Sequence, residues 1–380
     1  MRILIIDTYY PKFLSDFYHH YPTLASQPYT VQHQSLMGAC FGTSDYYSKH
    51  LNELGHEATE VVPNCEPLQR RWARENDIAI TDSDHWDLTW RRGVIPWVSR
   101  RHESNFFEKV LEAQIRDYRP DVLYVHDINA MSDEFIHRMR DHVRFIAGQT
   151  AFFLVDGRTY SGFDLMLTSF PHYVDRFRAN GIASEYFRLG FEPAVLDRLP
   201  PVTSHYDVTF AGGLTRAHKE RTKLLEAVAS RCAIDVWGYG VATLDRNSPL
   251  RARHHGPAWA LDMYQVLHQS RITLNQHVEA SEGYANNMRL YEATGVGALL
   301  ITDAKNNLND MFSVGNEVIA YHSIDECVEA VEYYLQHENE RAEIAHRGQA
   351  RTLKEHTYRH RMEELSEILQ RYVSIGRVSS

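Results

Sequence analysis

Glu292 is the residue whose type and surroundings point most directly to ligand chemistry. In the stretch from Asn286 to Asp303, a helix-forming segment ending at Gly295 precedes a short apolar run, a pattern that predicts a helix, a tight turn and a buried strand. Asn286 or Asn287 can cap this helix, and free N–H groups at a helix start attract anions. A carboxylate farther along can accept hydrogen bonds from a ribose diol. The alternative is an ordinary helix residue, but a phosphate seat beside a diol acceptor suggests a nucleotide.

A second candidate phosphate site lies at Gly212 and Gly213, directly after a predicted buried strand. Glycines let a ligand approach the backbone closely. Arg216, Lys219 and Arg221 follow within and just before the next predicted helix, and they supply positive charge. The sequence leaves open which of these three cations would anchor a diphosphate.

Polar side chains also end two other predicted strands. Asn275 and His277 close one of them, and the predicted strand 121–127 delivers His126 and Asp127 at its C-terminal end. In open α/β sheets ligands bind at the carboxyl ends of the strands. A neutral imidazole at His126 could hydrogen-bond a hydroxyl group that Asp127 helps to orient. The alternative is a structural capping role for this histidine.

The spacing Asn287-x-Arg289-x2-Glu292-x2-Gly295-x-Gly297 resembles the donor-binding segment of GT-B glycosyltransferases, specifically the CgeB-like group related to glycosyltransferase family 4. The resemblance covers the C-terminal half well and the N-terminal half loosely. It implies that Glu292 holds the ribose of a nucleotide-sugar and that the preceding turn approaches the diphosphate or the sugar.

Other segments extend this resemblance, with two departures. The helix end Leu51–Glu57 and the strand before His126 resemble N-terminal segments of family-4 enzymes, whose histidine lies near the sugar, and Tyr239 lies in a loop resembling one that frames the base. However, Gly213 stands where the family has an arginine. Tyr284 stands where the family has the first of two glutamates, which puts the sugar contact in doubt more than the ribose contact.

Two regions of the N-terminal half have less specific patterns. Gly38 and Gly42 could let the backbone approach a ligand in a cleft, or could simply begin a packed helix. The stretch 66–101 is rich in Arg and Trp and could dock a lipid headgroup, an anionic acceptor or a protein. We favour a solvated helical face with internal ion pairs. Asp82-Ser83-Asp84 resembles a metal-binding motif, but no strand is predicted before it.

The element pattern predicts an α/β protein of the GT-B class, with two doubly wound Rossmann-like domains facing a cleft. In the first domain we expect, among others, a helix ending at Ile146 and a strand at 151–155. The predicted division is an N-terminal acceptor domain at 1–192, a linker at 193–204, a C-terminal nucleotide-sugar donor domain at 205–356, and a C-terminal helix at 357–380 that crosses back to the N-terminal domain.

Composition excludes several classes of protein. The chain has 380 residues, 43% hydrophobic and 24% charged, which suits a globular protein of two or three domains. A net charge of −10 argues against nucleic-acid binding. No apolar run suits a membrane span or a signal peptide, and four scattered cysteines lack metal or disulfide spacing. We expect a cytoplasmic protein, with peripheral contact to a membrane as an open alternative.

The predicted function is transfer of a sugar from a nucleotide-diphosphate sugar to a hydroxyl of a saccharide, lipid-linked or protein acceptor, in the biosynthesis of a glycan or glycoconjugate. Fixed cations and helix starts can stabilise the leaving diphosphate, so we expect no metal and no other cofactor. The resemblance implies a retaining reaction. Two alternatives stay open: a nucleotide-sugar epimerase or hydrolase on the same fold, and a non-catalytic binding protein.

Overall fold

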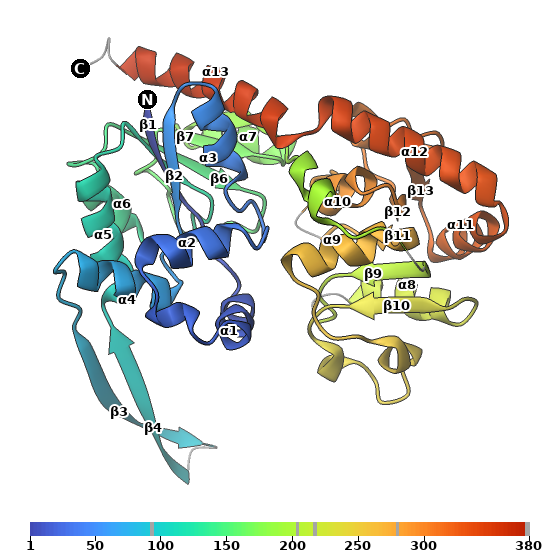
Figure 1. The fold of residues 1–380 in the computed structure, drawn as a ribbon, viewed down its shortest axis with the longest axis horizontal. Coiled ribbons are helices and arrows are strands. Elements are labelled where there is room, and N and C mark those ends of the chain that lie inside the picture. Colours follow the sequence, from blue (N-terminus) through green and yellow to red (C-terminus); the bar gives the residue numbers. More distant parts are fainter. Residues whose placement is uncertain (92–94, 203–204, 216–218, 279–280, 377–380) are drawn as a thin grey trace. The chain divides into compact units, whose positions relative to one another are not determined.

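The computed structural model describes residues 1–380 except 92–94, 203–204, 216–218, 279–280 and 377–380. Strands and helices alternate along most of the chain (Figure 1). Packing divides it into two units, the first with residues 1–150 and 154–166, and the second with residues 151–153 and 167–380.

A six-stranded sheet begins with the first strand of the chain. Its strands are β1 (Arg2–Ile6), β2 (Glu57–Val61), β5 (Val122–Val125), β6 (Phe145–Thr150), β7 (Leu165–Thr168) and β8 (Ala183–Tyr186), in the order β2-β1-β5-β6-β7-β8. The pairs β1–β2, β1–β5 and β5–β6 are parallel. β5 and β6 are buried throughout, and β5 is apolar or aromatic at every position, as is typical of a strand covered on both faces. Ile6 lies opposite Val125, so the residues after β1 and β5 emerge at the same edge.

Seven α-helices accompany these strands within the described residues. They are α1 (Pro11–His20), α2 (Tyr29–Met37), α3 (Tyr46–Glu53), α4 (Glu66–Glu75), α5 (Phe106–Tyr118), α6 (Asp133–Met139) and α7 (Pro171–Ala179). The predicted start of a helix at Pro171 is confirmed, since α7 begins at this residue. Proline suits the first helical position because it has no N–H that would be left unpaired there.

The stretch rich in Arg and Trp is helical only in its first part. Arg71 and Glu75 form the expected kind of ion pair on α4. The predicted helical face is wrong beyond that helix: β3 (Asp82–Arg91) and β4 (Ile95–Ser104) pair as an antiparallel ribbon, which in Figure 1 projects from the region of α4 and α5. The alternation of apolar and polar residues from Trp86 to Arg91 is the signal for this strand. The side chains of residues 83–103 lie outside the described part, so the docking role stays a prediction.

The predicted helix ending at Ile146 and the predicted strand at 151–155 are both wrong. The helix, α6, is shorter, and the strand, β6, lies earlier in the chain. The polar side chain of Gln149 disguised this strand, because it is buried and satisfied within the core. Its Oε1 atom accepts hydrogen bonds from the hydroxyls of Tyr47 (3.0 Å) and Tyr124 (2.7 Å).

The second unit contains a five-stranded parallel sheet. Its strands are β9 (Tyr206–Ala211), β10 (Ile234–Trp237), β11 (Ser270–Asn275), β12 (Leu299–Asp303) and β13 (Ile319–Tyr321), in the order β10-β9-β11-β12-β13. The helices are α8 (Lys219–Ala229), α9 (Ala260–His268), α10 (Arg289–Gly295), α11 (Ile324–Gln336), α12 (Glu338–Glu355) and α13 (Tyr358–Gly376). The short 3-10 segment η1 (Leu24–Ser26) belongs to the first unit. The second unit has η2 (Pro193–Arg198), η4 (Val241–Thr243), η5 (Pro249–Arg253) and η7 (Leu308–Asp310).

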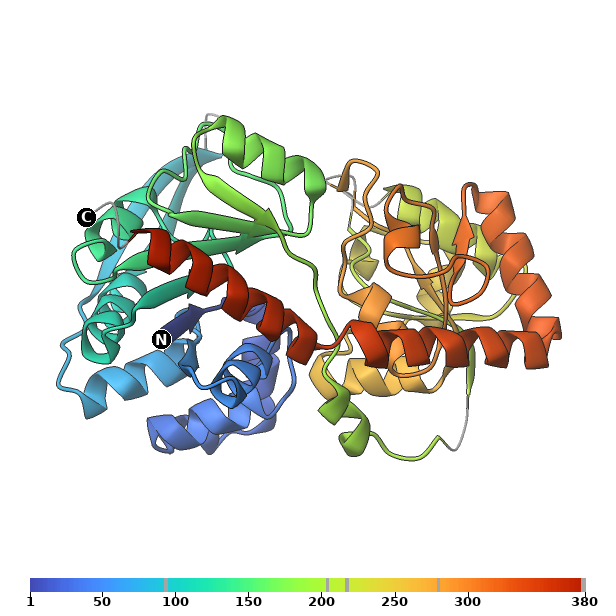
Figure 2. The same ribbon diagram turned by 90° about the horizontal axis from the view of Figure 1, so that it is seen from above.

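Two long helices follow one another at the C-terminal end of the chain (Figure 2). α12 packs against α10 and β12. The predicted apolar face of α13 is confirmed, since Met362, Leu365, Ile368 and Leu369 are all buried. The domain limits expected from the sequence stay a prediction.

Candidate functional site

Most of the predicted donor-site residues gather at one edge of the five-stranded sheet. β9, β11 and β12 are adjacent and parallel, so their carboxyl ends meet there. Gly212 and Gly213 follow β9, and Asn275 ends β11 opposite Thr302 of β12. This is the edge at which open α/β sheets bind ligands.

Two glycine turns pack backbone against backbone at this edge. Gly238 has a φ of +146°, and a Cβ on it would lie 1.9 Å from the carbonyl oxygen of Gly212. A Cβ on Gly213 would lie 3.0 Å from the ring of Tyr239. The Tyr239 ring is 46% exposed and stacks on Trp259 with a centroid distance of 6.4 Å. The turn therefore presents an aromatic ring, and its contact with a base stays a prediction.

The three candidate cations differ in what they can do. Arg221 is buried, and it donates from Nη1 to the carbonyl of Gly213 (3.1 Å) and from Nη2 to the carbonyl of Gln276 (2.9 Å). Burial lowers the pKa of Arg221. Through its two hydrogen bonds, Arg221 connects the turn after β9 to the loop after β11. Lys219 begins α8 and is exposed, whereas Arg216 lies outside the described residues.

The predicted capping of α10 by Asn286 or Asn287 is wrong. The N-cap residue is Met288, which makes no side-chain capping bond, and the helix has only seven residues. Asn287 instead donates to Oδ1 of Asn275 (2.8 Å), and Asn275 donates to Oγ1 of Thr302 (2.9 Å). Asn287 thus connects the start of α10 to the end of β11. Asn286 is buried near the same helix start.

Glu292 is buried and paired within its own helix. Its Oε2 atom lies 2.9 Å from Nη1 of Arg289, which also donates to the last carbonyl of β9 (3.2 Å). Burial raises the pKa of Glu292, and the charge of Arg289 opposes this. The helix ends at Gly295 as predicted, where a Cβ would lie 2.5 Å from Phe191, and the left-handed residue is Gly297 (φ +88°). The ribose contact stays a prediction.

Sequence reasoning missed a histidine–carboxylate pair at this edge. Nδ1 of His277 lies 2.7 Å from Oδ1 of Asp303, and Lys305 lies 3.0 Å from Oδ2. Burial alone would raise the pKa of Asp303, but the hydrogen bonds and charges of His277 and Lys305 lower it to about 2. Asp303 is therefore ionised at neutral pH. The sequence did contain a signal for this pair, because His277 and Asp303 each end a predicted strand and these two strands follow one another in the chain.

At the edge of the six-stranded sheet, the histidine of the predicted catalytic pair is half-buried. The ring of His126 contacts Tyr47 and Tyr124, with centroid distances of 4.4 and 5.2 Å. Burial lowers the pKa of His126 to about 3, so the imidazole is neutral at neutral pH. Asp127 accepts a hydrogen bond from Oγ1 of Thr8 (2.6 Å). The catalytic roles of both residues stay a prediction.

Asp7 is a further polar residue at this edge, and no role was assigned to it from the sequence. Burial raises the pKa of Asp7 to about 7, although a hydrogen bond from Thr43 (3.1 Å) opposes the shift. Gly42 precedes Thr43 with a φ of +59° and has no other atoms near its Cβ position. Gly38 caps the end of α2 in a right-handed conformation. A ligand approach at these glycines stays a prediction.

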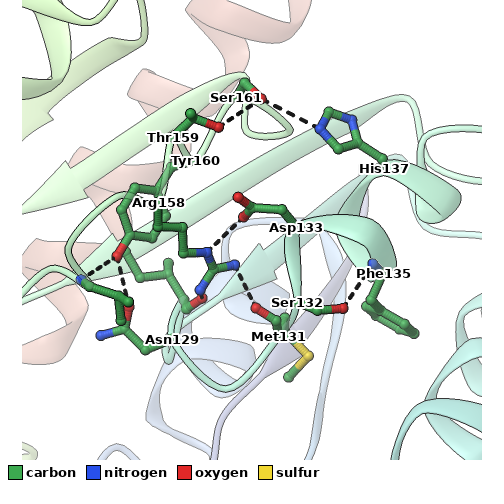
Figure 3. A network of polar contacts seen from close by, with 12 residues as sticks. Asn129, Met131, Ser132, Asp133, Phe135, His137, Arg158, Thr159, Tyr160 and Ser161 are labelled. Carbon is green, nitrogen blue, oxygen red and sulfur yellow. Dashed lines mark hydrogen bonds and ion pairs between the residues drawn. The ribbon is translucent and has the colours of Figure 1, made fainter.

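A polar network fixes the loop that follows the predicted catalytic pair (Figure 3). Arg158 donates to the backbone carbonyls of Ile128 (2.6 Å) and Met131. The hydroxyl of Tyr160 donates to Oδ1 of Asn129 (2.9 Å) in the same loop. The side chains of Arg158 and Tyr160 therefore hold the loop after β5 in place.

Comparison with known proteins agrees with this architecture. Residues 218–367 match the family model described as glycosyl transferase-like. Sucrose-phosphate synthase from Thermosynechococcus elongatus superposes with a TM-score of 0.60 at 10% identity, covering 99% of this chain and 100% of that one. HepE of Anabaena in complex with UDP-glucose superposes with a TM-score of 0.60 at 11% identity, covering 97% and 99%. The chain has the GT-B fold.

The GT-B fold confirms the predicted fold class, and the match to the glycosyl transferase-like family model lies in the C-terminal half. A glycosyltransferase from Rickettsia africae also superposes with this GT-B chain, with a TM-score of 0.58 at 10% identity over 98% of each chain. No curated protein sequence matches. The CgeB-like subgroup and the relation to family 4 stay predictions. Within the described residues, no helix is long and apolar enough to cross a membrane.

Proposed function

We propose that this protein is a glycosyltransferase that moves a sugar from a nucleotide-diphosphate sugar to an acceptor hydroxyl. One observation carries the proposal: the family match at 218–367 covers most of the buried polar residues at the edge of the five-stranded sheet. These include Arg221, Asn275 and Glu292, and the match also covers Arg289, the partner of Glu292. HepE, which has the same fold, was solved with UDP and with UDP-glucose.

We assign the leaving diphosphate to the turn after β9. Arg221 holds this turn in place, and the exposed Lys219 at the start of α8 is the proposed contact to the diphosphate. Fixed cations stabilise the negative charge that develops as the sugar–phosphate bond breaks. Glu292 is proposed to accept the ribose hydroxyls. This chemistry needs no metal and no dedicated base if the reaction is retaining, and His126 with Asp127 would then orient the hydroxyl groups.

Thermal unfolding with UDP, GDP, ADP, dTDP and CMP tests the donor site. A nucleotide at about a hundred times its dissociation constant stabilises the native protein by about 2.7 kcal/mol. For a unit of this size, each kcal/mol raises the midpoint by roughly 2 to 4 °C. We expect one nucleoside diphosphate to produce this shift.

Glu292→Gln keeps the size of the side chain and should weaken nucleotide binding about tenfold, because it removes a charge from the ribose hydrogen bonds. Glu329→Gln, at an exposed position of α11, is the matched control and should bind like the wild type. If no nucleotide stabilises the wild type, the donor-site proposal fails. Product analysis with the nucleotide-sugar then separates transfer from hydrolysis or epimerisation.

A further inference from the structure

The ring of His277 is held at the end of β11, and only one of its two nitrogens has a hydrogen-bond partner among the described residues. Its side chain has no exposed surface, and Nδ1 and the backbone N–H both point to Oδ1 of Asp303, at 2.7 and 3.0 Å. Nε2, on the opposite side of the ring, has no hydrogen-bond partner among the described residues. Buried polar atoms are nearly always paired in proteins, so an orphan at a candidate site indicates a missing ligand atom.

Two neighbouring side chains show the same deficit. Nε of Arg221 and Oδ1 of Asn287 are also buried without a partner in the described part of the chain. Arg221 donates to the carbonyl of Gln276, the residue before His277, and Asn287 contacts the end of β11. Three unpaired polar atoms therefore lie around the end of one strand.

The charges at this edge favour an anion. Arg221, Arg289 and Lys305 are three cations, and Asp303 and Glu292 are the two acids that they approach. Even with both acids ionised, one positive charge is left over. Nδ1 of His277 donates its hydrogen bond to the ionised Asp303, so Nε2 is free to donate a hydrogen bond to an anion when the ring carries both protons.

We propose that Nε2 of His277 donates a hydrogen bond to a phosphate oxygen of the donor's diphosphate, with Asp303 as the residue that orients the ring. This inference rests on the proposed function and adds a diphosphate contact after β11 to the cations of α8. Arg221 then acts mainly by shaping the site, because its two Nη groups already bind carbonyls.

Two substitutions separate a phosphate contact from a structural role. In His277→Asn the amide nitrogen replaces Nδ1 and keeps the bond to Asp303, but nothing replaces Nε2. In His277→Gln the amide nitrogen replaces Nε2, and the bond to Asp303 is lost. Isothermal titration measures the affinity of each variant for the nucleoside diphosphate, among UDP, GDP, ADP and dTDP, that stabilises the wild type. Melting without nucleotide checks that both variants fold.

We expect His277→Asn to bind the free nucleoside diphosphate roughly 10- to 100-fold more weakly, the effect of losing one charge-assisted hydrogen bond, and His277→Gln to retain most of the affinity. Loss in both variants, or in neither, overturns the phosphate contact while leaving the donor site intact. Loss confined to the nucleotide-sugar, with the free diphosphate bound normally, overturns it in favour of a sugar contact. A wild type that binds none of the diphosphates overturns both this inference and the proposed function.

Discussion

Asp7→Asn should remove a large pH dependence of stability from the N-terminal unit. Burial raises the pKa of Asp7 from 3.8 to about 7, so the folded protein holds a proton that the unfolded chain releases between these values. The native state then binds more protons than the unfolded state, and stability falls as pH rises from about 4 to about 7. Three pH units at 1.36 kcal/mol each give a loss of at most about 4 kcal/mol.

Asparagine is close to the neutral carboxyl group in shape, and its oxygen can still accept the hydrogen bond from Thr43. The variant should therefore resemble the wild type at pH 4.5 and be more stable at pH 8. For a domain of this size, 4 kcal/mol corresponds to roughly 8 to 16 °C in the unfolding midpoint.

The assay is thermal and urea unfolding of both proteins at several pH values from 4.5 to 8.5. Asp141→Asn, at an exposed position of the same unit, is the control and should shift neither curve by more than about 0.5 kcal/mol. If wild type and Asp7→Asn differ by the same amount at every pH, Asp7 does not hold a proton in the folded state and the reasoning is refuted.

Three further predictions follow from the packing. Gly238→Ala should lower the free energy of unfolding by more than about 3 kcal/mol and abolish nucleotide binding, because its Cβ would clash with Gly212. The control Gly256→Ala, also at positive φ but in open space, should lower it by only about 1 to 2 kcal/mol. Equal losses in urea unfolding would contradict this prediction. Gln149→Leu should lower the free energy of unfolding by roughly 2 to 6 kcal/mol, since two buried tyrosine hydroxyls lose their acceptor. An unchanged urea midpoint would show that water takes the place of this acceptor. Glu60→Gln should gain stability relative to the wild type as pH rises toward 8, because burial raises the pKa of Glu60 to about 8; unfolding curves that stay parallel across pH would count against it.

The resemblance of the segment from Asn287 to Gly297 was enough to anticipate the GT-B fold, and the match to the glycosyl transferase-like family covers that segment. The site inside it was anticipated less well. Glu292 and Arg289 were both singled out, but their mutual ion pair was not, because two residues of one short segment can face a ligand or each other. Only their neighbours in the folded unit decide which.

The elements that could be predicted from the sequence are those with local signals. Pro171 predicted the start of a helix, and the apolar face of the last helix predicted its burial. These signals are local, since proline geometry, helical periodicity and strand length depend only on nearby residues.

The hydrogen-bond partners of the buried polar groups, in contrast, depend on how the whole chain folds. Gln149 lies in a buried strand because two tyrosines distant in the sequence satisfy it, and Asn287 bonds Asn275 instead of capping its own helix. His277 and Asp303 come together because β11 and β12 are neighbours in register. A side-chain hydrogen bond depends on positions in space, and residues far apart in the sequence become neighbours only when the sheet forms.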